Sequence, residues 1–195
     1  MPLQDQLATI LATRSARRGH FTLASGRQST LYIDARLTTM SPDGLALIGP
    51  LAHHTLVESS WNVASVGGLT LGADPISYAI SYASAGTRIP LRAFSVRKEA
   101  KLYGTGKLIE GPFRKGDRVA VIEDVITTGG SALRAVDAVR AGGGEVVGVL
   151  ALVDREEGGR EAITATGLSV ISLVTAAQIL LVLSRDPDPS NQLGS

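Results

Sequence analysis

Apolar and polar positions along the chain alternate between two periods, one typical of strands and the other of helices. Short apolar runs rich in valine, isoleucine and leucine are separated by longer segments in which apolar residues recur at helical spacing. The apolar runs predict strands at 63–66, 91–96, 118–124, 145–153 and 168–173. The segments between them predict helices at 41–58, after Pro75, and at 131–141, 156–165 and 176–183. This alternation predicts an α/β fold with a mainly parallel sheet covered on both faces.

Residues 1–36 follow a different pattern. Apolar residues between 3 and 11 share one helical face, and a basic turn at 14–19 that ends in glycine predicts the end of a first helix. Residues 21–36 predict two short strands around a tight turn. At the other end, 184–195 has no apolar cluster, and we expect it to be a mobile tail.

Length and composition favour one cytoplasmic domain. A chain of 195 residues fits a single domain, which we expect to span 1–183. The 19 basic and 18 acidic residues give a net charge of +1, without the basic excess typical of nucleic-acid-binding proteins. The chain has no cysteine, which fits the cytoplasm, and no apolar run long enough to span a membrane. We therefore expect neither a nucleic acid nor a membrane as partner.

The segment VAVIEDVITTGGSA, 119–132, carries the clearest chemical signal. Its apolar strand ends in Glu123 and Asp124, which can accept hydrogen bonds from neighbouring hydroxyls of a ribose. The small residues at 127–131 then offer backbone N–H groups and hydroxyls to a phosphate, at the start of a helix whose dipole favours an anion. A structural role as strand end and helix cap explains one such residue but not two consecutive acids. The pattern predicts a site for a phosphorylated sugar.

The connection between the strands at 91–96 and 118–124 is much longer than the usual roughly four to six residues. It contains cations and flexible glycines: Arg97, Lys98, Lys101 and Lys107, with Gly104 and Gly106. Such a loop fits a lid over a polyanion, although a charge run alone is more often a solvated hairpin. The glycine-punctuated stretch 67–73 also follows a strand. It fits a donor loop for a diphosphate and a plain strand-to-helix turn equally well.

These segments together resemble a known family. Residues 119–132 resemble the phosphoribosyl diphosphate (PRPP) motif of type I phosphoribosyltransferases. RKEAKLYGTGKLIEG resembles the mobile catalytic loop of orotate phosphoribosyltransferases, and FTLASGRQSTLYID resembles their N-terminal substrate segment. The resemblance covers about 3–183. It implies the type I phosphoribosyltransferase fold: a mainly parallel central sheet flanked by helices, a small hood from about 1–36 plus the C-terminal part, and a long mobile catalytic loop.

The family pattern, carried over position by position, implies roles for individual residues. At PRPP it implies contacts from Arg97, Lys98, Lys101, Tyr103, Glu123, Asp124, Val125, Ile126, Thr127, Thr128, Gly129, Gly130 and Ser131. At orotate it implies contacts from Thr127, Arg155, Tyr32 and Ile33. Lys101 and Asp124 are the implied catalytic residues, and no side chain is implied as a metal ligand. An ion pair with Glu156 or Glu157 on the surface is the alternative role for Arg155.

Two positions depart from the family pattern. Ala24 stands where the family often has lysine, so one expected cation at the pyrophosphate is missing, and Arg27 is a candidate to replace it. Tyr103 stands where the loop usually has histidine, and it can donate a hydrogen bond but carries no charge near neutral pH. Both departures concern pyrophosphate contacts rather than the reaction class.

The resemblance also implies a reaction and its partners. The ribosyl 5-phosphate group of PRPP is transferred to N1 of orotate, which gives orotidine 5′-phosphate and pyrophosphate in pyrimidine biosynthesis. Mg²⁺ is expected to arrive with the substrate, since it usually retains water and phosphate ligands. A homodimer with shared active sites is implied as well. The alternatives are a phosphoribosyltransferase for another base, against which 21–34 and Arg155 argue, and a PRPP-sensing regulator without turnover.

Overall fold

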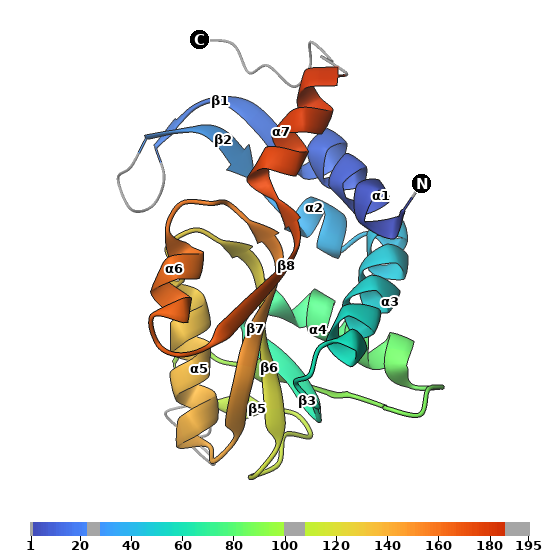
Figure 1. The fold of residues 1–195 in the computed structure, drawn as a ribbon, viewed down its shortest axis with the longest axis vertical. Coiled ribbons are helices and arrows are strands. Elements are labelled where there is room, and N and C mark those ends of the chain that lie inside the picture. Colours follow the sequence, from blue (N-terminus) through green and yellow to red (C-terminus); the bar gives the residue numbers. More distant parts are fainter. Residues whose placement is uncertain (1, 23–27, 100–107, 186–195) are drawn as a thin grey trace.

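The computed structural model describes residues 2–22, 28–99 and 108–185, which form a large sheet, a small sheet and the helices around them (Figure 1). The large sheet contains β3 (Ser65–Leu69), β4 (Arg92–Val96), β5 (Ile109–Glu110), β6 (Arg118–Ile126), β7 (Glu145–Asp154) and β8 (Ser169–Thr175). Its order is β5-β4-β3-β6-β7-β8, and every neighbouring pair except β4 and β5 is parallel. The predicted mainly parallel sheet is confirmed. The short edge strand β5 was not predicted.

Helices cover both faces of the large sheet because its central strands are apolar on both sides. They are α3 (Pro42–Glu58), α4 (Ala73–Ser84), α5 (Gly130–Ala141) and α6 (Gly159–Thr164). Along β6, Val119 and Val121 belong to one core cluster with α5 and α6, whereas Ala120 and Ile122 belong to the other with α3 and α4. Figure 1 shows these two pairs of helices on opposite sides of the sheet.

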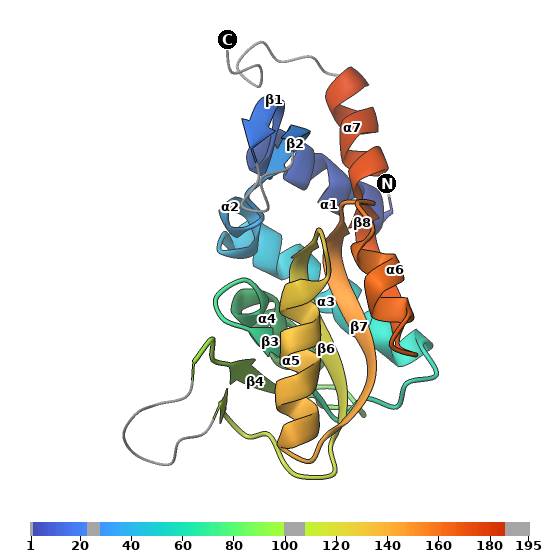
Figure 2. The same cartoon turned by 90° about the vertical axis from the view of Figure 1, so that its left-hand side faces the viewer.

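A small sheet lies beyond the carboxyl ends of β6, β7 and β8 (Figures 1 and 2). It pairs β1 (Ala16–Thr22) antiparallel with β2 (Gln28–Ile33), beside α1 (Leu3–Ile10), the π-helical turn η1 (Leu11–Ser15) and α7 (Ala176–Arg185). We call these five elements the hood. Gln4 Nε2 donates to the Leu173 carbonyl at 2.6 Å, and Arg18 Nη2 donates to the Leu180 carbonyl at 3.0 Å. The first contact joins α1 to β8 of the large sheet, and the second joins β1 to α7 within the hood.

The prediction that the first helix extends to Gly19 is wrong. Helical structure ends at Ser15, and Arg17 and Arg18 lie in β1, where they pair with residues of β2. The cause is the cross-strand pairing with β2, which overrides the weak local preference for helix. At the other end, α7 continues to Arg185, so residues 184 and 185 of the predicted tail belong to this helix. Residues 186–195 lie outside the described residues.

Several other boundaries differ from the predicted ones. β3 continues through Gly67 and Gly68, which the sequence analysis placed in a loop. A Cβ at Gly68 would collide with the Ile122 carbonyl of β6, so glycine allows the two strands to approach. Further differences are the end of β6 at Ile126, the start of α6 at Gly159, and the unpredicted short helix α2 (Arg36–Thr39). Within the described ranges, no helix is both long and apolar enough to cross a membrane.

Candidate functional site

Two adjacent carboxylates lie near the carboxyl end of β6. Glu123 is only 8% exposed. Burial, the charge of Asp124 and a hydrogen bond with Asp124 raise the pKa of Glu123 to about 8. Burial also raises the pKa of Asp124, although the Val125 N–H donates to its Oδ1 at 2.9 Å. Near neutral pH the Glu123 carboxyl therefore retains its proton unless a bound ligand favours the charged form.

The turn after β6 encloses a small cavity at the start of α5. Its volume is about 30 Å³, and its lining consists of Glu123 and residues 125–132. Gly129 has a φ of +81° and comes directly before α5. A Cβ there would lie 2.9 Å from the Gly159 carbonyl oxygen, so both conformation and space require glycine. The positive end of the α5 dipole faces this cavity, which suits a phosphate group.

A larger pocket of about 280 Å³ adjoins the small cavity at Glu123, which lines both. Its lining comes from distant parts of the chain: Arg36, residues 69–72, Lys98, Glu123, Asp124 and Ser131. The loop at 69–72 approaches the acids so closely that a Cβ at Gly72 would lie 2.5 Å from the Asp124 carboxyl group. The carboxyl ends of β3, β4 and β6 thus meet at one pocket, as expected for an open parallel sheet.

The described residues include only the ends of the predicted cationic loop. Lys98 lines the larger pocket, and its carbonyl accepts a hydrogen bond of 3.0 Å from Arg134 Nη2 of α5. Arg97 Nη1 lies 3.6 Å from Glu110 Oε1, and the Arg97 N–H donates to the Leu108 carbonyl at 2.8 Å. These contacts fix both ends of the loop to the sheet. Lys101, Tyr103, Gly104, Gly106 and Lys107 lie outside the described residues, as do Ala24 and Arg27.

Arg155 follows β7 directly and reaches the hood. It is 7% exposed, and its Nη2 donates to Ser29 Oγ and the Leu31 carbonyl, both at 2.7 Å. The same nitrogen donates to Glu157 Oε1 at 2.6 Å. The ion pair considered as an alternative is therefore present, but its arginine is buried. Arg155 Nε is also buried and has no hydrogen-bond partner within the described ranges, so it can donate to a further acceptor.

The other residues predicted at orotate are more dispersed. Thr127 lines the small cavity after β6. Ile33 belongs to the core, whereas Tyr32 is 42% exposed and its ring centroid lies 5.5 Å from that of Phe21. Of the residues predicted to bind substrate, Glu123, Asp124, the turn after β6 and Lys98 line two adjoining cavities. The structure places the Ile33 side chain in the core.

Arg36 was not predicted as a residue of the larger pocket. Arg36 begins α2, and its Nε and Nη2 donate to the two carboxylate oxygens of Asp34 at 2.8 and 2.9 Å. The only signal in the sequence is this acid and base two residues apart. It becomes informative only once β2 is placed over the carboxyl ends of the large sheet.

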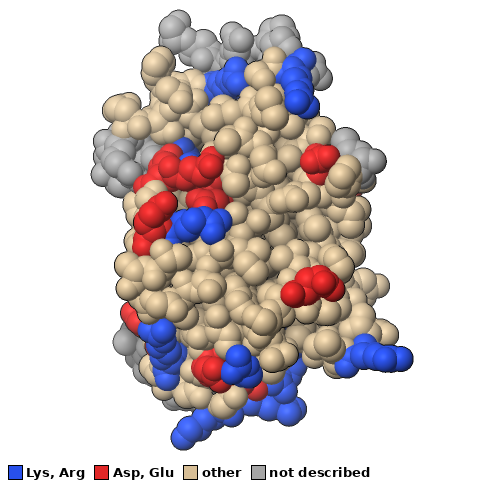
Figure 3. Space-filling model, in the orientation of Figure 1, with Lys and Arg blue, Asp and Glu red and all other residues tan. Residues whose placement is uncertain are grey.

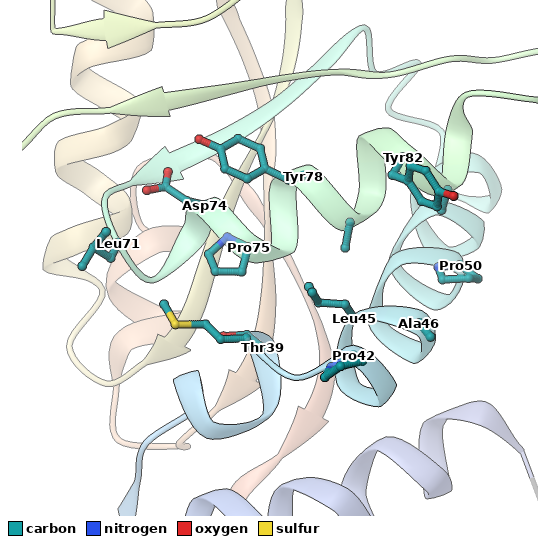
Figure 4. Close-up of a pocket in the computed structure, with 13 residues that line it drawn as sticks. Thr39, Pro42, Leu45, Ala46, Pro50, Leu71, Asp74, Pro75, Tyr78 and Tyr82 are labelled. Atoms are coloured by element: carbon teal, nitrogen blue, oxygen red, sulfur yellow. The ribbon is translucent and has the colours of Figure 1, made fainter.

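An apolar groove of about 800 Å³ lies between α3 and α4, beside the larger pocket (Figure 4). Its lining consists of Thr39, Met40, Pro42, Leu45, Ala46, Pro50, Leu71, Asp74, Pro75, Tyr78, Ala79, Tyr82 and Ala83. Leu71 is 64% exposed and lines both the groove and the pocket. Tyr82 is 87% exposed, and the Tyr78 hydroxyl is 2.8 Å from Ser95 Oγ. Apolar side chains that gather in one exposed groove make it a candidate contact surface for another protein.

Comparisons with known proteins agree on one family. No family model matches the chain. The chain is 46% identical over 180 residues to the orotate phosphoribosyltransferase of Aquifex aeolicus, covering 91% of this chain and 97% of that protein. It is 46% identical over 178 residues to the Mycobacterium tuberculosis orotate phosphoribosyltransferase, with the same coverages. A crystal structure of the M. tuberculosis enzyme in complex with PRPP has a TM-score of 0.77 at 44% identity, covering 91% of this chain and 99% of that chain.

Proposed function

Because the chain belongs to the orotate phosphoribosyltransferase family, we propose that its two adjoining cavities bind PRPP and that the ribosyl 5-phosphate group passes from there to orotate. The observation that carries this proposal is the position of Glu123, which lines both cavities beside Asp124. The products are orotidine 5′-phosphate and pyrophosphate, in pyrimidine biosynthesis. We place the reaction in the cytoplasm, in keeping with a chain that has no cysteine.

The two cavities suit the two ends of PRPP. The turn at 125–131 receives the 5′-phosphate, because its cavity is small and faces the start of α5. Glu123 and Asp124 accept hydrogen bonds from the ribose hydroxyls between the cavities. The diphosphate then extends into the larger pocket, toward Lys98 and the loop at 69–72. Arg97, Lys101 and Tyr103 complete the proposed pyrophosphate contacts when the cationic loop closes.

The chemistry needs charge stabilisation rather than a covalent intermediate. When pyrophosphate leaves, positive charge develops on the ribose ring and negative charge on the leaving group, as in glycoside chemistry. The Asp124 carboxylate, partly buried under the ring, stabilises the positive charge, and Lys98 with Lys101 stabilises the anion.

Mg²⁺ is the metal that fits this site. Its preferred ligands are oxygens, and PRPP supplies phosphate and hydroxyl oxygens in addition to the two carboxylates. Within the described ranges, no cluster of three or more histidines, cysteines or acids could hold a metal by itself. We therefore propose that Mg²⁺ is held mainly by PRPP, with Glu123 and Asp124 orienting the hydroxyls around it. The ion, when bound, neutralises charge on the departing pyrophosphate.

Orotate is proposed to bind on the hood side of the ribose. Arg155 contacts its carboxylate through the guanidinium, whose Nε has no partner in the described part of the chain. A charge-assisted contact of this kind contributes about 1.5–3 kcal/mol and favours orotate over a base without a carboxylate. Thr127, together with the β2 backbone at Tyr32 and Ile33, forms the rest of the proposed base site.

We propose a homodimer that uses the groove between α3 and α4. The groove is apolar, exposed and next to the larger pocket, so a second copy seated there would lie beside the substrate. Subunit exchange tests this arrangement. An equal mixture of Lys101→Ala and Asp124→Asn proteins, each nearly inactive, should regain about a quarter of the wild-type activity, since about half of the dimers are mixed and each of these contains one intact site of two. Mixed dimers without recovered activity would contradict shared sites.

One assay tests the function. The protein is mixed with Mg²⁺, PRPP and orotate, and the ultraviolet absorbance is followed as the free base becomes nucleotide. Adenine, guanine, hypoxanthine and uracil serve as competing bases, with pyrophosphate release as readout. Turnover of a purine in place of orotate would favour the other-base alternative. PRPP binding without turnover of any base would favour the PRPP-sensing regulator.

On the face shown in Figure 3, acidic and basic side chains lie in small groups, several of mixed sign, so this face offers no continuous basic surface for nucleic acid.

A further inference from the structure

Arg36 is the charged residue of the larger pocket that the family pattern leaves without a role. It lines this pocket together with Lys98 and Asp124. Its side chain is 54% exposed, and the negative charges of Asp34 and Asp124 both raise its pKa. Arg36 is therefore a permanent cation next to the carboxylates that are proposed to hold the ribose.

Asp34 fixes the orientation of Arg36. Two parallel hydrogen bonds of 2.8 and 2.9 Å join the guanidinium to the Asp34 carboxylate, and the Arg36 backbone N–H donates to Asp34 Oδ1 at 3.1 Å. Nε and Nη2 are occupied in this way, whereas Nη1 donates to none of the described residues. The arginine thus combines a fixed position with an available donor, which is the arrangement that binding a phosphoryl group requires.

The division between the two cavities indicates which end of PRPP Arg36 meets. The small cavity at 125–132, suited to the 5′-phosphate, does not include Arg36. The larger pocket includes Arg36, Lys98 and the loop at 69–72, and Glu123 lies at the boundary of the two cavities. A sugar held at Glu123 with its 5′-phosphate in the small cavity therefore points its diphosphate toward Arg36.

We propose that Arg36, held by Asp34, is a pyrophosphate-binding residue of this enzyme and supplies a cation that the chain lacks at Ala24. This inference rests on the proposed function, since it assumes that PRPP occupies the two cavities. Until pyrophosphate binds, Arg36 offsets the charge of Asp124. With PRPP bound, Nη1 donates to the diphosphate and the Asp34 contact keeps the guanidinium in place.

The experiment compares two ligands that each occupy one cavity. Binding of pyrophosphate with Mg²⁺ and binding of ribose 5-phosphate are measured by calorimetry for the wild-type protein, Arg36→Gln and Asp34→Asn. We expect Arg36→Gln to weaken pyrophosphate binding about ten- to a hundredfold and leave ribose 5-phosphate binding within about twofold. Asp34→Asn, which loosens the arginine without removing it, should weaken pyrophosphate binding less. In turnover, the KM for PRPP should rise while the KM for orotate is retained.

Arg14→Gln is the matched control, because Arg14 also forms a two-bond ion pair, with Asp43, and does not line the pocket. It should bind both ligands like the wild type. Unchanged pyrophosphate binding in Arg36→Gln would overturn the inference, and so would an equal loss for both ligands, which would indicate a structural effect. If the wild-type protein bound neither ligand, the proposed function itself would fail, which is a different outcome.

Discussion

The two sides of the proposed site are built in different ways. On the phosphate side, Glu123, Asp124 and the turn at 127–131 come from one continuous segment of strand, turn and helix. On the base side, Arg155 and β2 are far apart in the sequence and meet through hydrogen bonds between the end of β7 and the hood. The phosphate side is therefore fixed by local structure, whereas the base side depends on how the hood sits on the sheet.

The largest expected effect is on the phosphate side, from Asp124→Asn. Removing the charge under the ribose should lower kcat about a hundred- to a thousandfold, because the transition state loses a buried counter-charge. Steady-state kinetics with both substrates measures this loss. Asp137→Asn, an exposed acid on α5, is the control and should keep wild-type rates. A kcat for Asp124→Asn close to that of the control would remove Asp124 from the catalytic step.

On the base side, Arg155→Gln should raise the KM for orotate about ten- to a hundredfold and leave the KM for PRPP nearly unchanged. The reason is the loss of a charge-assisted contact with the orotate carboxylate. Arg118→Gln, which breaks an exposed ion pair with Glu145, is the control. If Arg155→Gln changed both KM values equally, the phosphate side and the base side would not bind their ligands independently. The main role of Arg155 would then be to position the hood on the sheet.

Gly129→Ala should have the opposite pattern, since it should affect the phosphate side and leave the base side nearly unchanged. A side chain at this positive φ should cost about 1 kcal/mol of unfolding free energy, and the distorted turn should weaken ribose 5-phosphate binding about tenfold. Gly116→Ala is the matched control, because Gly116 has a φ of +85° and its Cβ would meet no atom within 4 Å. Denaturant unfolding should show a loss for both variants, larger for Gly129→Ala because only its Cβ lies close to the Gly159 carbonyl oxygen. Equal ligand affinities for the two variants would exclude the turn as the phosphate site.

The smallest effect concerns pH. Since the pKa of Glu123 is about 8 and ribose hydroxyls donate to its charged form, PRPP should bind about threefold more tightly half a pH unit above this value than half a unit below. Stability has the opposite sign: the folded protein holds the extra proton, so the free energy of unfolding falls as pH rises from 4.5 to about 8. Both slopes should be smaller in Glu123→Gln, where the raised pKa of Asp124 still contributes. PRPP affinity that falls with pH would contradict this assignment.

The sheet and the acidic motif were predictable because their signals are local. The apolar runs that form β6 and β7 are buried on both faces, and the acids followed by a small-residue turn lie within one segment. The strand β1 was not predictable from its own residues, because Arg17 and Arg18 become a strand only through pairing with β2. Arg36 was missed for the same reason. Its proximity to Asp124 depends on where α2 lies relative to β6, and no local pattern records that.

The sequence by itself determined the alternation of strands and helices, the carboxylate pair with its phosphate turn, and the family, since each depends on neighbouring residues or on a characteristic segment. The tertiary structure alone decided that Glu123 lies between two cavities, that Arg155 is buried against β2, and that Arg36 shares a pocket with Lys98. The physical reason is that burial, raised pKa values and pocket walls arise from contacts between residues distant in the chain, which exist only after the hood has packed on the sheet.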